Sequence, residues 1–415
     1  VFSFASTAAG IVSFAGIALV HLLTLNPLVS GEPVGSGLIF NDLLFGYLVP
    51  AVLAGFVYWM SATGRPDEYR FAAGALSGLL AFFYITLEIL VLFDGEYPAY
   101  ASIGQIEWYV LVIAWLIFGF VVMRLAHLLR PQPLQRAAYY SALLLVALGV
   151  LGQVFWANPL LSGASIGSIP LFNQLLLGYL APALLCAAIY RFCVAPDAPW
   201  VRHFIGLATG ISGFAYVSLQ ILALHRGEFL ATDDLLAREW YSLTIVWLLI
   251  AGAILRWHAS LHDKQLELIV SAASLALIAV AVIGQLTRYN PMLTGQSVGE
   301  GLIFNELMKG YLITALLCAA LYHWNKRQLH ERVRQAIGMG AGLLAFAYLS
   351  LMVRSYFHGA VLTSGATTPG AWYSYSVDWL LVAVGLPPSG LWLRSLTLSA
   401  APPSVIPHTV VTMLA

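Results

Sequence analysis

The amino-acid sequence predicts an all-α fold: a polytopic transmembrane helical bundle of about twelve spans, built as three parallel four-helix tandem repeats of 132 residues. Three observations predict it. The 415-residue chain is 60% hydrophobic and only 9% charged, with a mean hydropathy of +0.84. Its apolar residues fall into span-length runs, and one distinctive segment occurs three times at a constant offset. Since soluble domains carry roughly 25% charged residues, this composition favours a membrane protein.

The apolar runs supply the predicted spans. A hydrocarbon core about 30 Å thick needs roughly 20 apolar residues per helix. Runs that approach this length lie at 4–25, 38–60, 71–93, 106–128, 137–157, 170–192, 203–224, 240–257, 268–289, 302–323, 335–356 and 372–386. Taken four at a time, they predict three repeats, at residues 1–136, 137–265 and 266–392.

The end of the third repeat departs from the other two. By analogy with its counterparts, the last span should continue through 387–392, but it meets Pro387 and Pro388 there. Because prolines break or kink a helix, we expect this span to be irregular. Residues 393–415 form a non-membrane tail without the expected next helix. We interpret this ending as a truncated or frameshifted gene end.

The repeated segment reads NPLVSGEPVGSGLIFNDLLFGYL at 26–48, NPLLSGASIGSIPLFNQLLLGYL at 158–180 and NPMLTGQSVGEGLIFNELMKGYL at 290–312. Self-similarity at a fixed period marks repeat architecture. An even number of spans per repeat returns the chain to its starting side, so the repeats must be parallel rather than inverted. The proline after each first asparagine disfavours helical geometry. We therefore expect one span to end at this segment and the next to begin near its Phe-Asn pair.

The basic residues predict the orientation of the chain. Lys and Arg gather in cytoplasmic loops, and 14 of the 19 lie in or beside the connections that follow the second and fourth spans of each repeat. The opposite loops are acidic. We therefore expect the N-terminus of this chain in the cytoplasm and an outer surface that favours neutral or cationic partners over polyanions. The pattern contains no basic patch for nucleic acid.

Two asparagines and a tyrosine recur in each copy of the segment, close to the expected outer surface. They are the candidate ligand-binding residues: Asn26, Asn41, Tyr47, Asn158, Asn173, Tyr179, Asn290, Asn305 and Tyr311. One interpretation is structural, because asparagine caps helices and satisfies turns. The other is that the amides and phenols line an outward-facing cleft, where they suit sugars, polar lipid headgroups or cations better than hydrolytic chemistry.

Ionisable residues within the expected spans break the threefold pattern and form a second set of candidates. A charge at a helix centre costs about 2.5–3.5 kcal/mol on insertion scales, so each such residue is a functional hypothesis. The set is His21, Glu88, Glu306, Lys309, Arg354 and Asp378. Glu88 and Arg354 lie near span ends, where long side chains reach the interface. Glu306 and Lys309 have the spacing of an intrahelical ion pair.

Signals for catalysis are weak. The sequence has no phosphate loop, dinucleotide fingerprint or nucleophile elbow, and His258 and His262 share a helical spacing without an accompanying acid or cysteine. We predict neither a cofactor nor a metal, and no catalytic residue can be assigned. The favoured class is a carrier, channel or flippase for a polar envelope component. The runner-up is a lipid-linked glycosyltransferase-like enzyme that uses Glu32, Asp42, Glu96 or Glu107, and the third is a scaffold without turnover.

The recurring NPLxSG, Phe-Asn and Gly-Tyr-Leu elements, the four-span period and the Trp-Tyr pairs at 108–109, 240–241 and 372–373 resemble a known family. They are similar to the multi-pass bacterial membrane proteins grouped as domain of unknown function 2339, over nearly the whole chain up to about residue 385. The resemblance implies a place in the bacterial cytoplasmic (inner) membrane, with lipids as partners. It also implies a piece of a longer chain whose N- and C-terminal parts are missing. It supplies no activity or substrate; a glycan or lipid-linked substrate fits the candidate residues. The Trp-Tyr pairs are typical of interfacial anchors.

Overall fold

The computed structural model describes residues 2–35, 37, 39–62, 64–98, 103–193, 199–231, 234–257, 264–301, 304–325 and 329–394. In this part of the chain the regular structure is helical, apart from one isolated antiparallel bridge between Ser165 and Phe229. The chain divides into two compact units, Val1–Asp234 and Leu235–Ala415, called unit 1 and unit 2 below. Most of the predicted tail, residues 395–415, lies outside the described residues.

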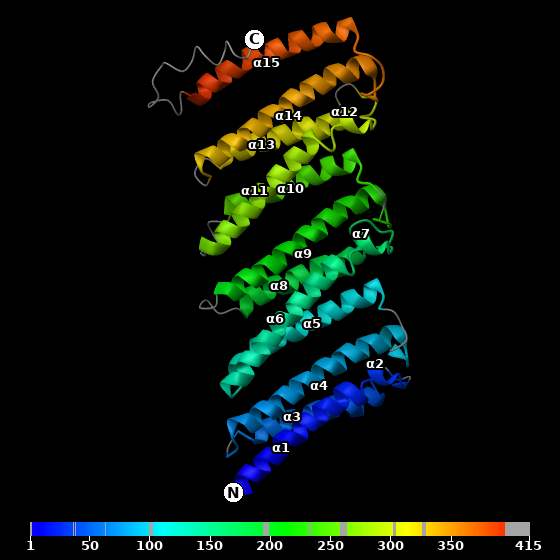
Figure 1. The fold of residues 1–415 in the computed structure, drawn as a ribbon, viewed down its shortest axis with the longest axis vertical. Helices are drawn as coiled ribbons and strands as arrows, with labels where there is room; N and C mark the ends of the chain where they lie inside the picture. Colours follow the sequence, from blue (N-terminus) through cyan, green and yellow to red (C-terminus); the bar gives the residue numbers. More distant parts are fainter. Residues whose placement is uncertain are drawn as a thin grey trace. The chain divides into compact units, whose positions relative to one another are not determined.

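Unit 1 contains the first predicted repeat and most of the second (Figure 1). Its first elements are α1 (Phe2–Leu19), η1 (Val20–Thr24), α2 (Pro27–Ser30), η2 (Leu44–Leu48), α3 (Val49–Met60), α4 (Asp67–Asp94), α5 (Gln105–Leu125) and η4 (Ala126–Leu128). The elements that follow are α6 (Gln132–Phe155), α7 (Pro159–Ser162), η5 (Leu176–Leu180), α8 (Ala181–Phe192) and α9 (Pro199–Arg226). The short segments η2 and η5 are π-helical turns, each joined directly to the α-helix that follows it.

Unit 2 repeats the same order of elements, starting from the helix that ends the second predicted repeat. Its elements are α10 (Ala237–Trp257), α11 (Lys264–Leu286), α12 (Pro291–Thr294), η7 (Met308–Leu312), α13 (Ile313–Trp324), α14 (Glu331–His358) and α15 (Pro369–Arg394). Again a π-helical turn, η7, leads into an α-helix. Helix α15 includes Pro387 and Pro388, where the sequence predicts a break. A proline removes one backbone donor, and helices in membranes tolerate that loss.

The apolar helices of both units are suited to a membrane. Each predicted run contains a helix, and eight helices of the described chain are long and apolar enough to cross a bilayer. Two shorter apolar helices, Leu44–Met60 and Leu176–Phe192, fall below that length. The protein is therefore an all-helical membrane protein, whereas the count of twelve spans and the three four-helix repeats stay predictions.

Helix packing crosses the predicted repeat boundaries. In unit 1, α5 packs along α6 and α8, and these helices with α9 enclose a core that includes Val112 and Val146. In unit 2, α10 packs along α11 and α13 in the same way, around a core that includes Leu248 and Leu344. The helix that ends one predicted repeat therefore packs on the helices of the first two predicted spans of the next repeat.

The tyrosines of the Trp-Tyr pairs at the start of α5 and α10 are core residues rather than interfacial anchors. Tyr109 and Tyr241 are buried, and their hydroxyls donate to the carbonyl oxygens of Ala157 and Tyr289, each at 2.9 Å. The sequence could not indicate this, because the partner carbonyls lie just after the end of the helix that packs alongside, α6 or α11. In the third copy, Tyr373 is 74% exposed.

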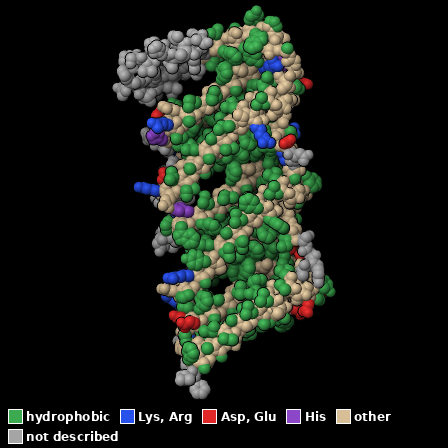
Figure 2. Space-filling view, viewed as in Figure 1, with side chains coloured by type: hydrophobic (Ala, Val, Ile, Leu, Met, Phe, Trp, Pro, Cys, Tyr) green, Lys and Arg blue, Asp and Glu red, His purple; other side chains and the backbone are tan. Residues whose placement is uncertain are grey.

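Hydrophobic side chains also cover the visible outer faces of the helices, and charged side chains gather towards the helix ends (Figure 2). Phe155, Leu161 and Leu184, for example, are large apolar residues that are each more than half exposed. In water such continuous apolar surface would drive association, but in a bilayer it contacts lipid tails. The surface therefore agrees with the apolar composition.

Candidate functional site

The first asparagine of each repeated segment caps a short helix. The side-chain oxygens of Asn26, Asn158 and Asn290 each accept a hydrogen bond at 3.0 Å from the backbone N–H two residues later. Proline follows at the first helical position in every copy, where its missing N–H costs nothing. Each short helix then ends at a glycine with φ between +66° and +70°, a conformation that glycine adopts without strain.

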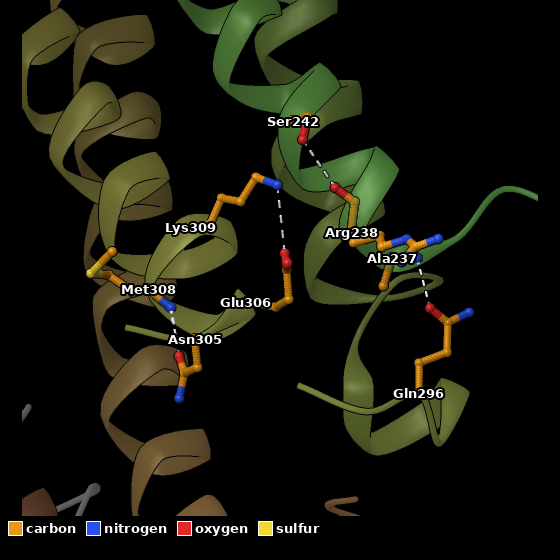
Figure 3. A network of polar contacts seen from close by, with 8 residues as sticks. All are labelled: Ala237, Arg238, Ser242, Gln296, Asn305, Glu306, Met308 and Lys309. Carbon is orange, nitrogen blue, oxygen red and sulfur yellow. Dashed lines mark hydrogen bonds and ion pairs between the residues drawn. The ribbon is translucent and has the colours of Figure 1, made fainter. Parts of the chain in front are cut away.

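The second asparagine also caps the helix that follows it, but its amide nitrogen differs between copies. Asn41, Asn173 and Asn305 accept from the backbone N–H groups of Leu43, Leu175 and Met308 at 3.0–3.1 Å. The Asn305 bond is drawn in Figure 3. The capping function accounts for the recurrence of this residue at the start of each π-helical turn.

Among the described contacts of the second asparagine, its amide nitrogen meets a carboxylate only in the first copy. The Nδ2 atom of Asn41 lies 3.2 Å from both oxygens of Glu88 on α4. In the third copy, the Nδ2 atom of Asn305 donates to the carbonyl of Gly301 at 2.9 Å and lies 3.6 Å from the sulfur of Met352, the counterpart of Glu88. The structure thus joins two candidates, Asn41 and Glu88, that the sequence placed in separate sets.

The recurring tyrosines are buried in the π-helical turns. Tyr47, Tyr179 and Tyr311 are at most 2% exposed, and their hydroxyls donate to backbone carbonyls of the preceding long helix. The acceptors are the carbonyl oxygens of His21, Gln153 and Gln285, at 2.7, 2.9 and 2.9 Å. A ligand at these phenols would have to compete with those bonds. The hydroxyls also satisfy carbonyls at the point where a long helix ends.

The other ionisable candidates do not join the Asn41–Glu88 pair, although the His21 ring packs edge-on against Tyr47, with the ring centroids 5.7 Å apart. His21 places its Nδ1 atom 2.8 Å from the carbonyl of Ile17. Lys309 and Glu306 form an ion pair at 3.7 Å, each about one third exposed (Figure 3). Arg354 donates to three acceptors in the loop that follows α14, and Asp378 has one buried carboxylate oxygen without a hydrogen-bond partner among the described residues.

A polar concavity in unit 1 joins the end of α4 and the start of α5 to the second copy of the repeated segment. It has a volume of about 400 Å³, within the range of small-ligand pockets. Its lining comprises Phe93, Asp94, Gly104, Gln105, Ile106, Glu107, Ser165 and Gln174. We call it the Glu107 cavity. Its polar side chains are two carboxylates, two amides and a hydroxyl, and no basic residue is among them.

Glu107 is the chemically distinctive member of this lining. It is 3% exposed, and its Oε2 atom accepts a hydrogen bond at 2.9 Å from the backbone N–H of Gly104, which caps α5. Its Oε1 atom and the Oδ2 atom of Asp94 are buried without hydrogen-bond partners in the described part of the chain. The two carboxyl groups also interact electrostatically, and they lie close enough to share a hydrogen bond when one of them carries a proton. Buried carboxylate oxygens are destabilised unless a cation or a donor satisfies them.

Sequence reasoning named Glu107 only as one of four carboxylates for an enzyme, and it did not name Asp94 as a site residue. It missed Gln105, Ser165 and Gln174, because their proximity depends on the packing of α5 against the next repeat. One signal was available. Ala371 occupies the position of Glu107 in the third copy, so the acid breaks the repeat.

The polar side chains that line the cavity suit an organic cation or a ligand rich in hydroxyl groups better than a metal ion. Among the described residues, no group of three or more His, Cys, Asp or Glu side chains could hold a metal ion. Carboxylates accept hydrogen bonds, and the amides of Gln105 and Gln174 carry both donors and acceptors. An ammonium group or a sugar hydroxyl could satisfy the unpaired oxygens.

Comparison with known proteins identifies a family. A family model described as predicted membrane protein (DUF2339) matches the chain three times, at residues 1–151, 130–283 and 255–402. No curated protein and no solved structure matches the chain. The three overlapping matches follow one another along the chain as the repeated segments do.

Proposed function

Because this chain belongs to the DUF2339 family of predicted membrane proteins, we propose that it transports or flips a polar component of the cell envelope, which binds in the Glu107 cavity. The ligand class is a glycan, a lipid headgroup or a cation, and the charges favour a group that carries an ammonium. In this proposal the recurring asparagines and tyrosines hold helix ends in place and do not themselves bind the ligand.

One observation supports the proposal: Glu107 and Asp94 each place in a cavity of about 400 Å³ a buried carboxylate oxygen that has no hydrogen-bond donor among the described residues. Removing a carboxylate from water without pairing it costs several kcal/mol, and a cationic ligand would offset that cost. Gln105, Ser165 and Gln174 add the polar groups that orient such a ligand. Phe93 and Ile106 supply an apolar wall, as ligand sites commonly have.

The test uses a substitution that keeps the fold and removes the charge. In Glu107→Gln the side-chain oxygen can still accept the capping hydrogen bond, since glutamine serves the same capping position as glutamate. Glu239→Gln is the matched control, because Glu239 is equally buried and caps α10 through the N–H of Leu236. Any general effect of losing a capping carboxylate should appear in both variants.

Ethanolamine is the cationic probe, and sorbitol is the uncharged control at the same concentration. A ligand at 100 times its dissociation constant stabilises a protein by about 2.7 kcal/mol. We expect ethanolamine to raise the melting temperature of the native protein and of Glu239→Gln, but not of Glu107→Gln. Uptake of labelled ethanolamine into proteoliposomes should show the same dependence. Equal responses of all three proteins would contradict the proposal.

The same carboxylate is the one observation that favours the enzyme alternative. A lipid-linked glycosyltransferase-like protein needs a single carboxylate beside its acceptor, and Glu107 is among the residues named for that role. The two functions differ in the products they form. If Glu107→Gln abolished formation of a glycosylated product without reducing ligand stabilisation, the enzyme would replace the transporter.

A further inference from the structure

Unit 2 contains an apolar groove formed by α11, α13 and α14, which we call the α11–α14 groove. Its volume is about 630 Å³, and Arg332 is the only charged residue in its lining. The floor is buried and includes Ile278 and Cys318. The rim is exposed: Met339 and Leu343 are 66% and 56% accessible. Because the outer face of a membrane helix contacts lipid, the groove opens towards lipid tails.

At two positions of the groove the third copy has a smaller residue than at least one of the other copies, although Ala72 of the first copy is as small as Ala336. Gly340 occupies the position of Ala208 in the second copy and of Leu76 in the first, and Ala336 occupies the position of Phe204. Leu76 and Ala208 are core residues, and Phe204 packs against the same core as Ala208. Leu76 in the first copy and Phe204 in the second therefore take up volume that the third copy leaves open at the equivalent positions.

Arg332 gives the groove a charged end. It lies in the first turn of α14, whose apolar span begins at Glu331, so it is placed at the edge of the hydrocarbon region. The neighbouring carboxylate of Glu331 forms an ion pair with Arg334, and no carboxylate of the described residues is paired with the exposed guanidinium of Arg332. Arginine is well suited to phosphate, which it can bind through two parallel N–H groups.

The length of the groove corresponds to one leaflet. Along α14 its lining extends from Arg332 to Leu343, and eleven steps of about 1.5 Å span roughly 16 Å. Half of a hydrocarbon core of about 30 Å is about 15 Å. One acyl chain that starts from a headgroup at Arg332 would therefore end near Leu343.

We propose that the α11–α14 groove holds one anionic phospholipid, with its phosphate on Arg332 and one acyl chain between α11 and α14. The lipid fills volume that Leu76 takes up in the first copy and Phe204 in the second. This site lies in unit 2 and does not depend on the Glu107 cavity or on the proposed transport.

The experiment uses photo-crosslinking of the full chain in lipid nanodiscs. The probes are phosphatidylglycerol and phosphatidylcholine, each with a diazirine in the acyl chain, and mass spectrometry locates the labelled peptides. The readout is labelling of residues 275–286 and 336–343, relative to the corresponding segment 143–154 of the second copy. This ratio removes the general enrichment of anionic lipid around a basic protein surface.

Gly340→Leu places in the groove the residue that the first copy has, and Ala336→Phe places there the residue of the second. A Cβ at Gly340 would lie 3.6 Å from Val282, an ordinary contact, so the groove has room for a side chain. Gly342→Leu is the control on the same helix, because a Cβ there meets nothing within 4 Å. Arg332→Gln removes the charge and leaves the groove open.

We expect native protein and Gly342→Leu to be labelled in the groove by phosphatidylglycerol, and either filling variant to lose that labelling. Arg332→Gln should reduce the preference for phosphatidylglycerol over phosphatidylcholine by about five-fold, the effect of one basic residue near an anionic surface. Unchanged labelling in whichever filling variant folds would overturn the proposal, and so would equal labelling of the native groove by both lipids.

Discussion

The glycines of the π-helical turns offer a graded test of how one repeat packs on the next. Gly46, Gly178 and Gly310 are equivalent positions. At only two of them does another side chain lie close to where a Cβ would be. A Cβ on Gly178 would lie 2.6–2.8 Å from the ring of Tyr109, and one on Gly310 would lie 2.8–2.9 Å from the ring of Tyr241. A Cβ on Gly46 would meet nothing within 4 Å.

These distances set the expected magnitudes. The tyrosine rings are buried and their hydroxyls are hydrogen-bonded, so they cannot move aside without breaking contacts. Overpacking of this kind costs about 1–3 kcal/mol, whereas glycine to alanine in a helix without a clash gains up to about 1 kcal/mol. We expect Gly178→Ala and Gly310→Ala to be less stable than Gly46→Ala by about 1–3 kcal/mol.

The measurement is equilibrium unfolding of each purified variant in mixed micelles, followed by helical circular dichroism and tyrosine fluorescence. Gly46→Ala serves as the matched control because it makes the same chemical change in the same kind of turn. Equal stability of the three variants would refute the reasoning, since it would mean that the tyrosines of α5 and α10 do not pack on the following repeat.

Two further substitutions test individual hydrogen-bond sets. Arg354→Met should loosen the loop after α14, because the guanidinium donates hydrogen bonds to Leu362, Gly365 and Thr367. Hydrogen bonds from a charged group contribute about 1.5–3 kcal/mol each. Limited proteolysis should therefore cut residues 359–368 faster in the variant, and an unchanged rate would contradict this role. Asn290→Ala should cost about 1 kcal/mol through the lost cap, whereas Asn290→Asp, which keeps an acceptor, should melt close to the native temperature. Equal melting temperatures of the two variants would exclude capping as the reason for this residue.

Much of the fold could be predicted because the relevant signals are local. Apolar runs show where helices form, and proline after asparagine shows where a helix stops. The capping function of the asparagine in each Asn-Pro turn is also a local signal, because asparagine favours the N-cap and proline the first helical position. The packing of α5 on α6 and α8 could not be predicted, since it depends on side chains such as Tyr109 fitting against glycines far along the chain. For this reason Tyr109 and Tyr241, which the sequence predicts at the membrane interface, prove to be core residues.

The candidate site was predictable only in part. Glu107 could be named as an acid near the outer ends of the helices, but composition says nothing about which of its oxygens lacks a partner. Asn41 and Glu88 were named separately, and their contact depends on the packing of α3 and η2 against α4. The groove beside Gly340 follows from a comparison of the three copies, but only once the structure shows that these positions face one space.

The central claim is that a four-helix membrane element recurs in the same sense along this chain. Single cysteines at Val29, Leu161 and Leu293 test it directly, in a background whose three native cysteines are replaced by alanine. These equivalent positions in the Asn-Pro turns are 64%, 68% and 72% exposed. The claim predicts that a membrane-impermeant maleimide labels all three from the same side of sealed vesicles, and labelling of any one from the opposite side would contradict it.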